Sequence, residues 1–199
     1  MSNKDRVSIE LFHRDQYFLG KENRQRYGWA IYHWAILIRP KDIRKVSKCA
    51  SHDVTDAATM DETGTRYLPA DGTWRFRSKN PVNPLNTGHF LVAIDVGKLP
   101  KNVTNTQIKA LLAHTSLLKS GQSPERNCVS WTRDAFLALR RAGFVDGAFS
   151  VEDVMAEEMQ EADLVMRDGV PDKDEYRFID VGVVSRKIAA MKAAQENRE

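Results

Sequence analysis

The feature that most constrains the fold of this sequence is an apolar run at residues 28–38, Gly-Trp-Ala-Ile-Tyr-His-Trp-Ala-Ile-Leu-Ile, which ends at Arg39-Pro40. A strand built from this run has no polar face, so it has to be covered on both sides. The run therefore predicts a central strand of a sheet, with His33 in its middle. An imidazole buried there without a partner would cost on the order of 1–3 kcal/mol. His33 is either a core histidine bonded to a backbone carbonyl or a functional group.

The periodicity of the other segments predicts a mixed fold. Alternating or β-prone runs indicate further strands at residues 7–12, 49–57 and 89–96, and the second of these is expected to pair with the central strand. Helical patterns occupy residues 104–118, 128–141 and 151–167, with a frayed helix at the C-terminus. We therefore expect one α+β domain over residues 1–199, an antiparallel sheet with a helix packed on it, and a helical C-terminal extension over 150–199.

A cysteine opens the strongest of these helical patterns. One helix face carries Cys128, Trp131, Thr132, Ala135 and Leu139. If Asn127 is the cap, Cys128 lies in the first turn, where free N–H groups and the helix dipole favour a thiolate. A competing start at Ser123-Pro124 would place Cys128 one turn further in. A free cysteine is also among the most buried residue types, so a packed core residue is the alternative to a nucleophile.

Composition argues against several functional classes. The 30 basic and 27 acidic side chains leave a net charge of +3, spread along the chain, so no nucleic-acid partner is expected. Cys49 and Cys128 form no disulfide framework. The five histidines are scattered and the glycines form no phosphate-binding loop, so neither a metal nor another cofactor is expected. Without a signal-like N-terminus or a long apolar run, a cytoplasmic protein with no stable membrane anchor is expected.

Two motifs together carry a resemblance. Tyr32-His33-Trp34-Ala35-Ile36 and Asn127-Cys128 resemble the circularly permuted branch of the NlpC-type, papain-like thiol enzymes, whose best-known members are lecithin:retinol acyltransferase-like phospholipase/acyltransferases. In that family the histidine is the base and the cysteine, at a helix start, is the nucleophile. The resemblance implies these roles for His33 and Cys128 and a permuted papain-like core over residues 28–145. The chain is also similar, over residues 28–165, to small, mostly uncharacterised fungal proteins.

The third residue of such a site has two candidates. In the family a second histidine on the next strand orients the base, which implies His52 here. The neighbouring Asp53 would serve equally well, because a carboxylate accepts the imidazole N–H and stabilises the imidazolium. Side chains alternate across a strand, so His52 and Asp53 cannot both face His33. We favour Asp53 and keep His52 as the alternative.

Two departures from the family bear on the substrate. The acyltransferases have a tyrosine two residues before the base, where this chain has Ile31. Their C-terminal membrane-anchoring helix is absent here, which argues against a phospholipid substrate.

The resulting hypothesis is a thiol hydrolase or acyltransferase. Cys128 would attack an ester, thioester or amide carbonyl of a small or acyl-carrying substrate, His33 would transfer the proton, and the amide of Cys128 would help to bind the oxyanion. Two alternatives stay open: a non-catalytic binding or scaffold module with the same fold, and an isopeptidase of the permuted papain-like type. The oligomeric state is not determined by the sequence.

Overall fold

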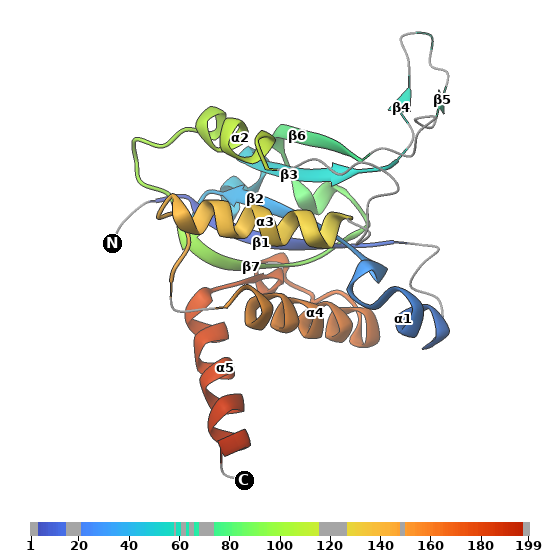
Figure 1. Ribbon diagram of the computed structural model, residues 1–199, viewed down its shortest axis with the longest axis vertical. Coiled ribbons are helices and arrows are strands. Elements are labelled where there is room, and N and C mark those ends of the chain that lie inside the picture. Colours follow the sequence, from blue (N-terminus) through green and yellow to red (C-terminus); the bar gives the residue numbers. More distant parts are fainter. Residues whose placement is uncertain are drawn as a thin grey trace.

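A computed structural model describes residues 4–14, 21–57, 59–60, 63, 66–67, 74–115, 127–147 and 150–196. Its body is a six-stranded sheet with the strand order β6-β3-β2-β1-β7-β8 (Figure 1). The strands are β1 Arg6–His13, β2 Tyr32–Arg39, β3 Cys49–Thr55, β6 Arg75–Val82, β7 Phe90–Lys98 and β8 Phe178–Ile179. All pairs are antiparallel except β7 with β8. A separate pair joins β4 Thr59–Met60 to β5 Arg66–Tyr67.

Helices pack mainly on one side of this sheet. They are α1 Lys21–Tyr27, α2 Asn105–Ala113, α3 Cys128–Arg141, α4 Val151–Asp168 and α5 Val181–Glu196. In Figure 1, α3 crosses in front of β2. Helix α4 lies below α3, next to β7, and α5 extends away from the sheet. Contacts of α3 with β2 and β3, and of α4 with β7 and β1, agree with this arrangement. The predicted α+β class, with the helix that begins at Cys128 packed on a largely antiparallel sheet, is confirmed.

The apolar run predicted as the central strand is β2, which lies between β1 and β3. Its first four residues, Gly28–Ile31, instead form a 3-10 helix. Gly28 has a φ of +51°, a value that glycine adopts without a side-chain clash, so the chain turns there before the strand begins. The strand itself is buried along nearly its whole length, as a strand with two apolar faces requires.

The two faces of β2 have different surroundings. Its even-numbered side chains, such as Trp34 and Ile36, join the main core cluster with Trp131 of α3, and we call this side the helix face. The odd-numbered side chains, from His33 to Arg39, lie on the other side of the strand, which we call the opposite face. A smaller cluster on this face contains Leu37, Cys49, Phe90 and Ala93.

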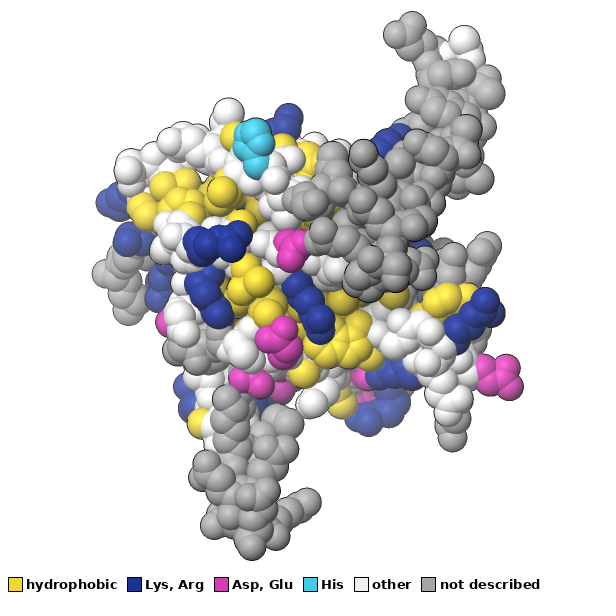
Figure 2. Space-filling view, viewed as in Figure 1, with side chains coloured by type: hydrophobic (Ala, Val, Ile, Leu, Met, Phe, Trp, Pro, Cys, Tyr) yellow, Lys and Arg dark blue, Asp and Glu magenta, His cyan; other side chains and the backbone are white. Residues whose placement is uncertain are grey.

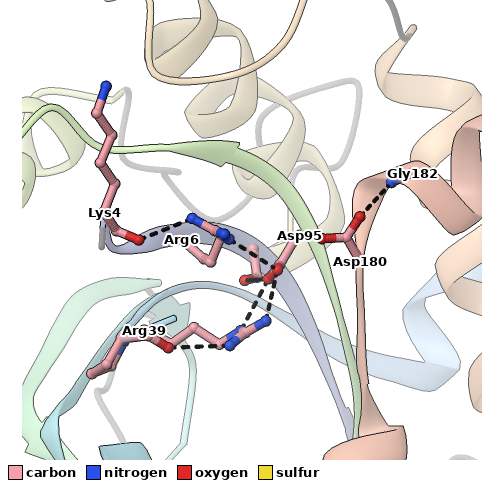
Figure 3. A network of polar contacts seen from close by, with 8 residues as sticks. Lys4, Arg6, Arg39, Asp95, Asp180 and Gly182 are labelled. Carbon is pink, nitrogen blue, oxygen red and sulfur yellow. Dashed lines mark hydrogen bonds and ion pairs between the residues drawn. The ribbon is translucent and has the colours of Figure 1, made fainter. Parts of the chain in front are cut away.

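The opposite face buries charged groups in pairs. Arg39 of β2 donates to Asp95 of β7 at 2.6 and 3.0 Å, and Ser8 donates to the same carboxylate at 2.7 Å. Arg6 of β1 adds a contact at 3.7 Å, so two arginines from adjacent strands converge on one aspartate (Figure 3). Buried charges persist where they are paired and hydrogen-bonded. His33 projects from the same face of the sheet, at the other end of β2.

Helix α3 begins at the residue that the Asn127 cap predicts. The Asn127 side chain accepts hydrogen bonds from the amides of Val129 and Ser130, and Ser130 Oγ accepts one from the Asn127 amide. Asn127 has an extended backbone, with φ −148° and ψ −168°, so Cys128 is the first helical residue. The competing helix start at residues 123–124 lies outside the described residues. Gly143, with φ +76°, follows the C-terminal end as predicted.

The C-terminal segment contributes to the same core. Val154, Met155 and Ala162 of α4 belong to the main buried cluster, and β8 extends the sheet beyond β7. The division into a core over residues 28–145 and an extension over 150–199 stays a prediction.

The outer surface of α3 is mixed in character. Hydrophobic and basic side chains lie side by side over this region (Figure 2), and the basic residues of α3 itself are all arginines. Leu137 of this helix is 37% exposed. None of the described helices combines the length and the apolar character needed to cross a membrane.

Candidate functional site

His33 and Asp53 form a direct pair on the opposite face of the sheet. His33 is the second residue of β2 and Asp53 lies on the neighbouring strand β3. His33 Nε2 is 2.9 Å from Asp53 Oδ2, a hydrogen-bond distance. The side chain of His33 is 16% exposed and that of Asp53 is 6% exposed. The pair is thus shielded from water, and one side of the imidazole still reaches the surface.

A third strand holds the aspartate in place. Arg77 of β6 stands directly opposite Asp53 in the β3–β6 register. Its Nε donates to Asp53 Oδ1 at 2.9 Å and its Nη2 donates to Oδ2 at 2.5 Å. Burial alone would raise the pKa of Asp53, but the hydrogen bonds from His33 and Arg77 lower it to about 2. Asp53 is therefore a fixed anion at neutral pH.

The imidazole also interacts with Cys128. Burial of the ring lowers the pKa of His33, while its hydrogen bond to Asp53 and its interaction with the Cys128 side chain raise it by more, to about 9. The Sγ of Cys128 is 3.9 Å from the carbonyl oxygen of Tyr32, the residue before His33. Cysteine and histidine thus approach each other at the start of β2, from α3 and from the sheet respectively.

Cys128 has no exposed surface. It lies in the first turn of α3, beside the partial positive charge of a helix N-terminus. The Asn127 side chain accepts hydrogen bonds from the amides of Val129 and Ser130, but not from the amide of Cys128. A molecule the size of a substrate can reach the sulfur only if neighbouring atoms move.

His52 does not join this group. It follows the alternation of β3 and lies on the helix face, stacked on Phe76 with ring centroids 6.1 Å apart. Phe76 in turn packs against Trp131 of α3. Within the described residues neither ring nitrogen of His52 has a hydrogen-bond partner, and burial lowers its pKa to about 4. Of the two candidates for the third residue, Asp53 contacts His33 on the opposite face, and His52 lies on the helix face.

A cavity of about 320 Å³ opens beside this site on the opposite face. His33, Asp53 and Arg77 line it, together with residues from β1, β3, β6 and the loop before β7. The remaining lining residues are Phe12, His13, Arg14, Ser51, Thr55, Asp56, Ala57, Lys79, Thr87 and His89. His33 lines the cavity and Cys128 does not.

The sequence pattern did not identify Arg77 as a member of the site. The available signal was the alternation of cations at positions 75, 77 and 79, which places three positive side chains on one face of β6. Using that signal requires knowing that β6 pairs with β3, which is a long-range contact. No group of three or more His, Cys, Asp or Glu side chains within the described part of the chain could hold a metal ion.

Fold and site together define an α+β protein in which a cysteine at a helix start, a strand histidine and a strand aspartate meet across the sheet. The chain belongs to DUF6914, a family of unknown function, which matches residues 4–165. The matched segment contains Cys128, His33, Asp53 and His52. No curated protein and no solved structure matches the chain.

Proposed function

We propose that this protein is a cysteine-dependent hydrolase or acyltransferase acting on an ester, a thioester or an amide. The observation that carries the proposal is the hydrogen bond between His33 and Asp53 at the start of β2, where Cys128 Sγ lies 3.9 Å from the carbonyl oxygen of the preceding residue, Tyr32. A thiol nucleophile needs a neighbouring base, and that base needs a third group to fix its orientation. The permuted papain-like resemblance is a separate, weaker support.

The tautomer of His33 follows from its partner. Asp53 engages Nε2, so the proton that passes to or from the sulfur is carried by Nδ1. In the first step the Cys128 thiolate attacks the carbonyl carbon, and the carbonyl oxygen becomes an oxyanion that the Cys128 amide can bind. His33 then protonates the leaving group, which departs and leaves an acyl-thioester on Cys128.

The second step returns the enzyme to its starting state. His33 removes a proton from water or from an acceptor, and the resulting nucleophile attacks the thioester carbonyl. Collapse of this tetrahedral intermediate releases the product and regenerates the Cys128–His33 pair. Asp53 stays ionised throughout, because Arg77 compensates its charge when His33 is neutral.

Intact-mass spectrometry tests the covalent step. After incubation with a panel of activated esters and thioesters, we expect one acyl adduct, mapped by peptide analysis to Cys128. Cys128→Ser should lose that adduct and His33→Gln should form it more slowly. Cys49→Ser is the matched control, because Cys49 is buried elsewhere and its pKa is raised to about 12 by burial. Equal labelling of both cysteines, or no adduct with any ester or thioester, would contradict the proposal.

One observation favours the non-catalytic alternative, a binding or scaffold module. Cys128 is completely buried and packs in the main core cluster with Trp131. If the thiol serves only packing, Cys128→Ala should lower the free energy of unfolding by about 1 kcal/mol or more. A nucleophile held for chemistry should tolerate Cys128→Ser with little loss of stability. Thermal unfolding of the two variants separates these functions.

A further inference from the structure

The cavity beside His33 carries more positive than negative side chains. The cationic lining residues are Arg14, His33, Arg77 and Lys79, and the anionic ones are Asp53 and Asp56. Asp53 is engaged by both His33 and Arg77, so it cannot also neutralise a third cation. A cavity walled by low-dielectric protein focuses such a charge excess on whatever enters it.

Lys79 is the least compensated of these cations. It lies two residues from Arg77 on the same face of β6, and it stands opposite Ser51 in the β3–β6 register. Within the described residues, no hydrogen-bond or ion-pair partner is found for its ammonium group. Its side chain is exposed, so the charge is available to a ligand in the cavity.

One edge of the Arg77 guanidinium takes no part in the pair with Asp53. Its Nε and Nη2 bind Asp53, while Nη1 takes no part in that pair. The side chain is 37% exposed and lines the cavity. A guanidinium can bind one carboxylate through one edge and donate to a second acceptor through its remaining N–H groups.

The acid beneath the cavity floor does not cancel this charge. Glu10 lies behind Ser51, whose hydroxyl donates to Glu10 Oε1 at 2.5 Å. Burial raises the pKa of Glu10 to about 8, despite the opposing hydrogen bond from Ser51. Glu10 is therefore mostly neutral at pH 7, and the lining keeps its positive balance.

We propose that this cavity binds a small ligand through a carboxylate or phosphate group, with Lys79 and the free edge of Arg77 as the recognising cations. Carboxylates and phosphates are the anions that arginine and lysine bind in proteins. The cavity lies at the small end of the range of about 300–1,000 Å³ for ligand pockets, which fits a small molecule or the end of a larger one. The site stands whether or not Cys128 becomes acylated.

Isothermal titration calorimetry with two small anions tests the site. The probes are inorganic phosphate and succinate, and uncharged succinamide is the matched negative control. We expect saturable binding of at least one anion, accompanied by a change in the imidazole chemical shift of His33, and no binding of succinamide. Phosphate alone would identify a phosphate site, and succinate alone a carboxylate site.

Variants locate the binding in the cavity. Lys79→Gln should weaken anion binding about tenfold or more, because one charged hydrogen-bond donor is lost, and Lys79→Glu should abolish it. Lys98→Gln is the control, since Lys98 is also an exposed strand lysine but does not line the cavity. The proposal is overturned if neither anion binds at millimolar concentration, if succinamide binds as well, or if Lys79→Gln and Lys98→Gln behave alike. Anion binding without any acyl adduct on Cys128 would leave this site standing and remove the covalent function.

Discussion

Asp53 and Arg77 face each other across the β3–β6 pair, joined by two hydrogen bonds of 2.9 and 2.5 Å. The same carboxylate holds His33 Nε2 at 2.9 Å. One buried anion thus connects three strands and leaves Nδ1 as the ring nitrogen of His33 that does not contact Asp53. The charge of Asp53 therefore helps to keep the imidazole of His33 protonated.

Replacing Asp53 with asparagine should make the imidazole easier to deprotonate. Asp53→Asn removes the negative charge that helps to raise the pKa of His33 to about 9, so that pKa should fall by about 1–3 units. Stability should fall by about 1–3 kcal/mol, because Arg77 loses its charged partner. NMR titration of the His33 ring measures the first effect and denaturant unfolding the second. Asp56→Asn is the control, since Asp56 is exposed and lines the same cavity. An unchanged His33 titration in Asp53→Asn would show that the pair does not set the charge of the ring.

The two cysteines should differ in reactivity. Cys128 interacts with a histidine that is protonated below about pH 9, whereas burial raises the pKa of the Cys49 thiol to about 12. We expect iodoacetamide to modify Cys128 in the native protein while Cys49 reacts only after unfolding. His33→Gln should slow the reaction at Cys128 about tenfold or more at neutral pH, because the positively charged ring beside the sulfur is lost. Peptide mapping after timed alkylation gives both rates. Identical rates at the two sites, or a Cys128 rate that ignores His33→Gln, would count against an activated thiol.

Glu10 should make the protein less stable as the pH rises. Its folded-state pKa of about 8 exceeds the ordinary value of 4.5, so between these values the folded state binds a proton that the unfolded state has released. Stability therefore decreases through this window and levels off above it. His33 adds a decrease between pH 6.5 and about 9.

Glu10→Gln separates the two contributions, because glutamine keeps an oxygen for Ser51 and has no proton to lose. Glu10 accepts a hydrogen bond from the hydroxyl of Ser51 and interacts electrostatically with several ionisable groups, namely Asp53, His33, Lys79, Arg77, Cys49 and Glu158. We expect the variant to have a higher melting temperature than the wild type at pH 9. Its melting temperature should also fall less between pH 5 and pH 9. If stability depends on pH in the same way in the wild type and in Glu10→Gln, the pKa of Glu10 is not raised by burial.

Gly97 should not tolerate a side chain. A Cβ at this position of β7 would lie 1.9 Å from the backbone oxygen of Phe144, in the loop that follows α3. Gly97→Ala should therefore shift that loop and cost about 1–3 kcal/mol of stability. Thermal unfolding measures the loss, and Gly88→Ala is the control because a Cβ there meets nothing within 4 Å. A Gly97→Ala variant as stable as Gly88→Ala would show that the loop adapts freely.

Local patterns predicted much of this architecture. The apolar run predicted a central strand, because a strand with two apolar faces must be covered on both sides. The Asn127 cap predicted that α3 begins at Cys128. Alternation along β3 separated His52 from Asp53, since adjacent side chains point to opposite faces. These inferences use only neighbours in the chain.

What the sequence did not predict depends on distant pairing. Arg77 reaches Asp53 through the β3–β6 register, which no local pattern specifies. The sequence left a packed and a nucleophilic Cys128 as alternatives, and its complete burial arises from the way α3 packs on β2 and β3. The 3-10 helix at Gly28–Ile31 was hidden because its residues are as apolar as the strand that follows.

His33 and Cys128 reach each other from different sides of one sheet, so no single element holds both. Cys128 is placed by the packing of α3 on β2 and β3, and Trp131, nearly one helical turn after Cys128, packs against Phe76 of β6. Shortening the Trp131 side chain would therefore change how Cys128 sits against the sheet without altering His33 or Asp53. Under the proposed function, the hydrocarbon packing on the helix face would thereby tune the acid–base chemistry of the site.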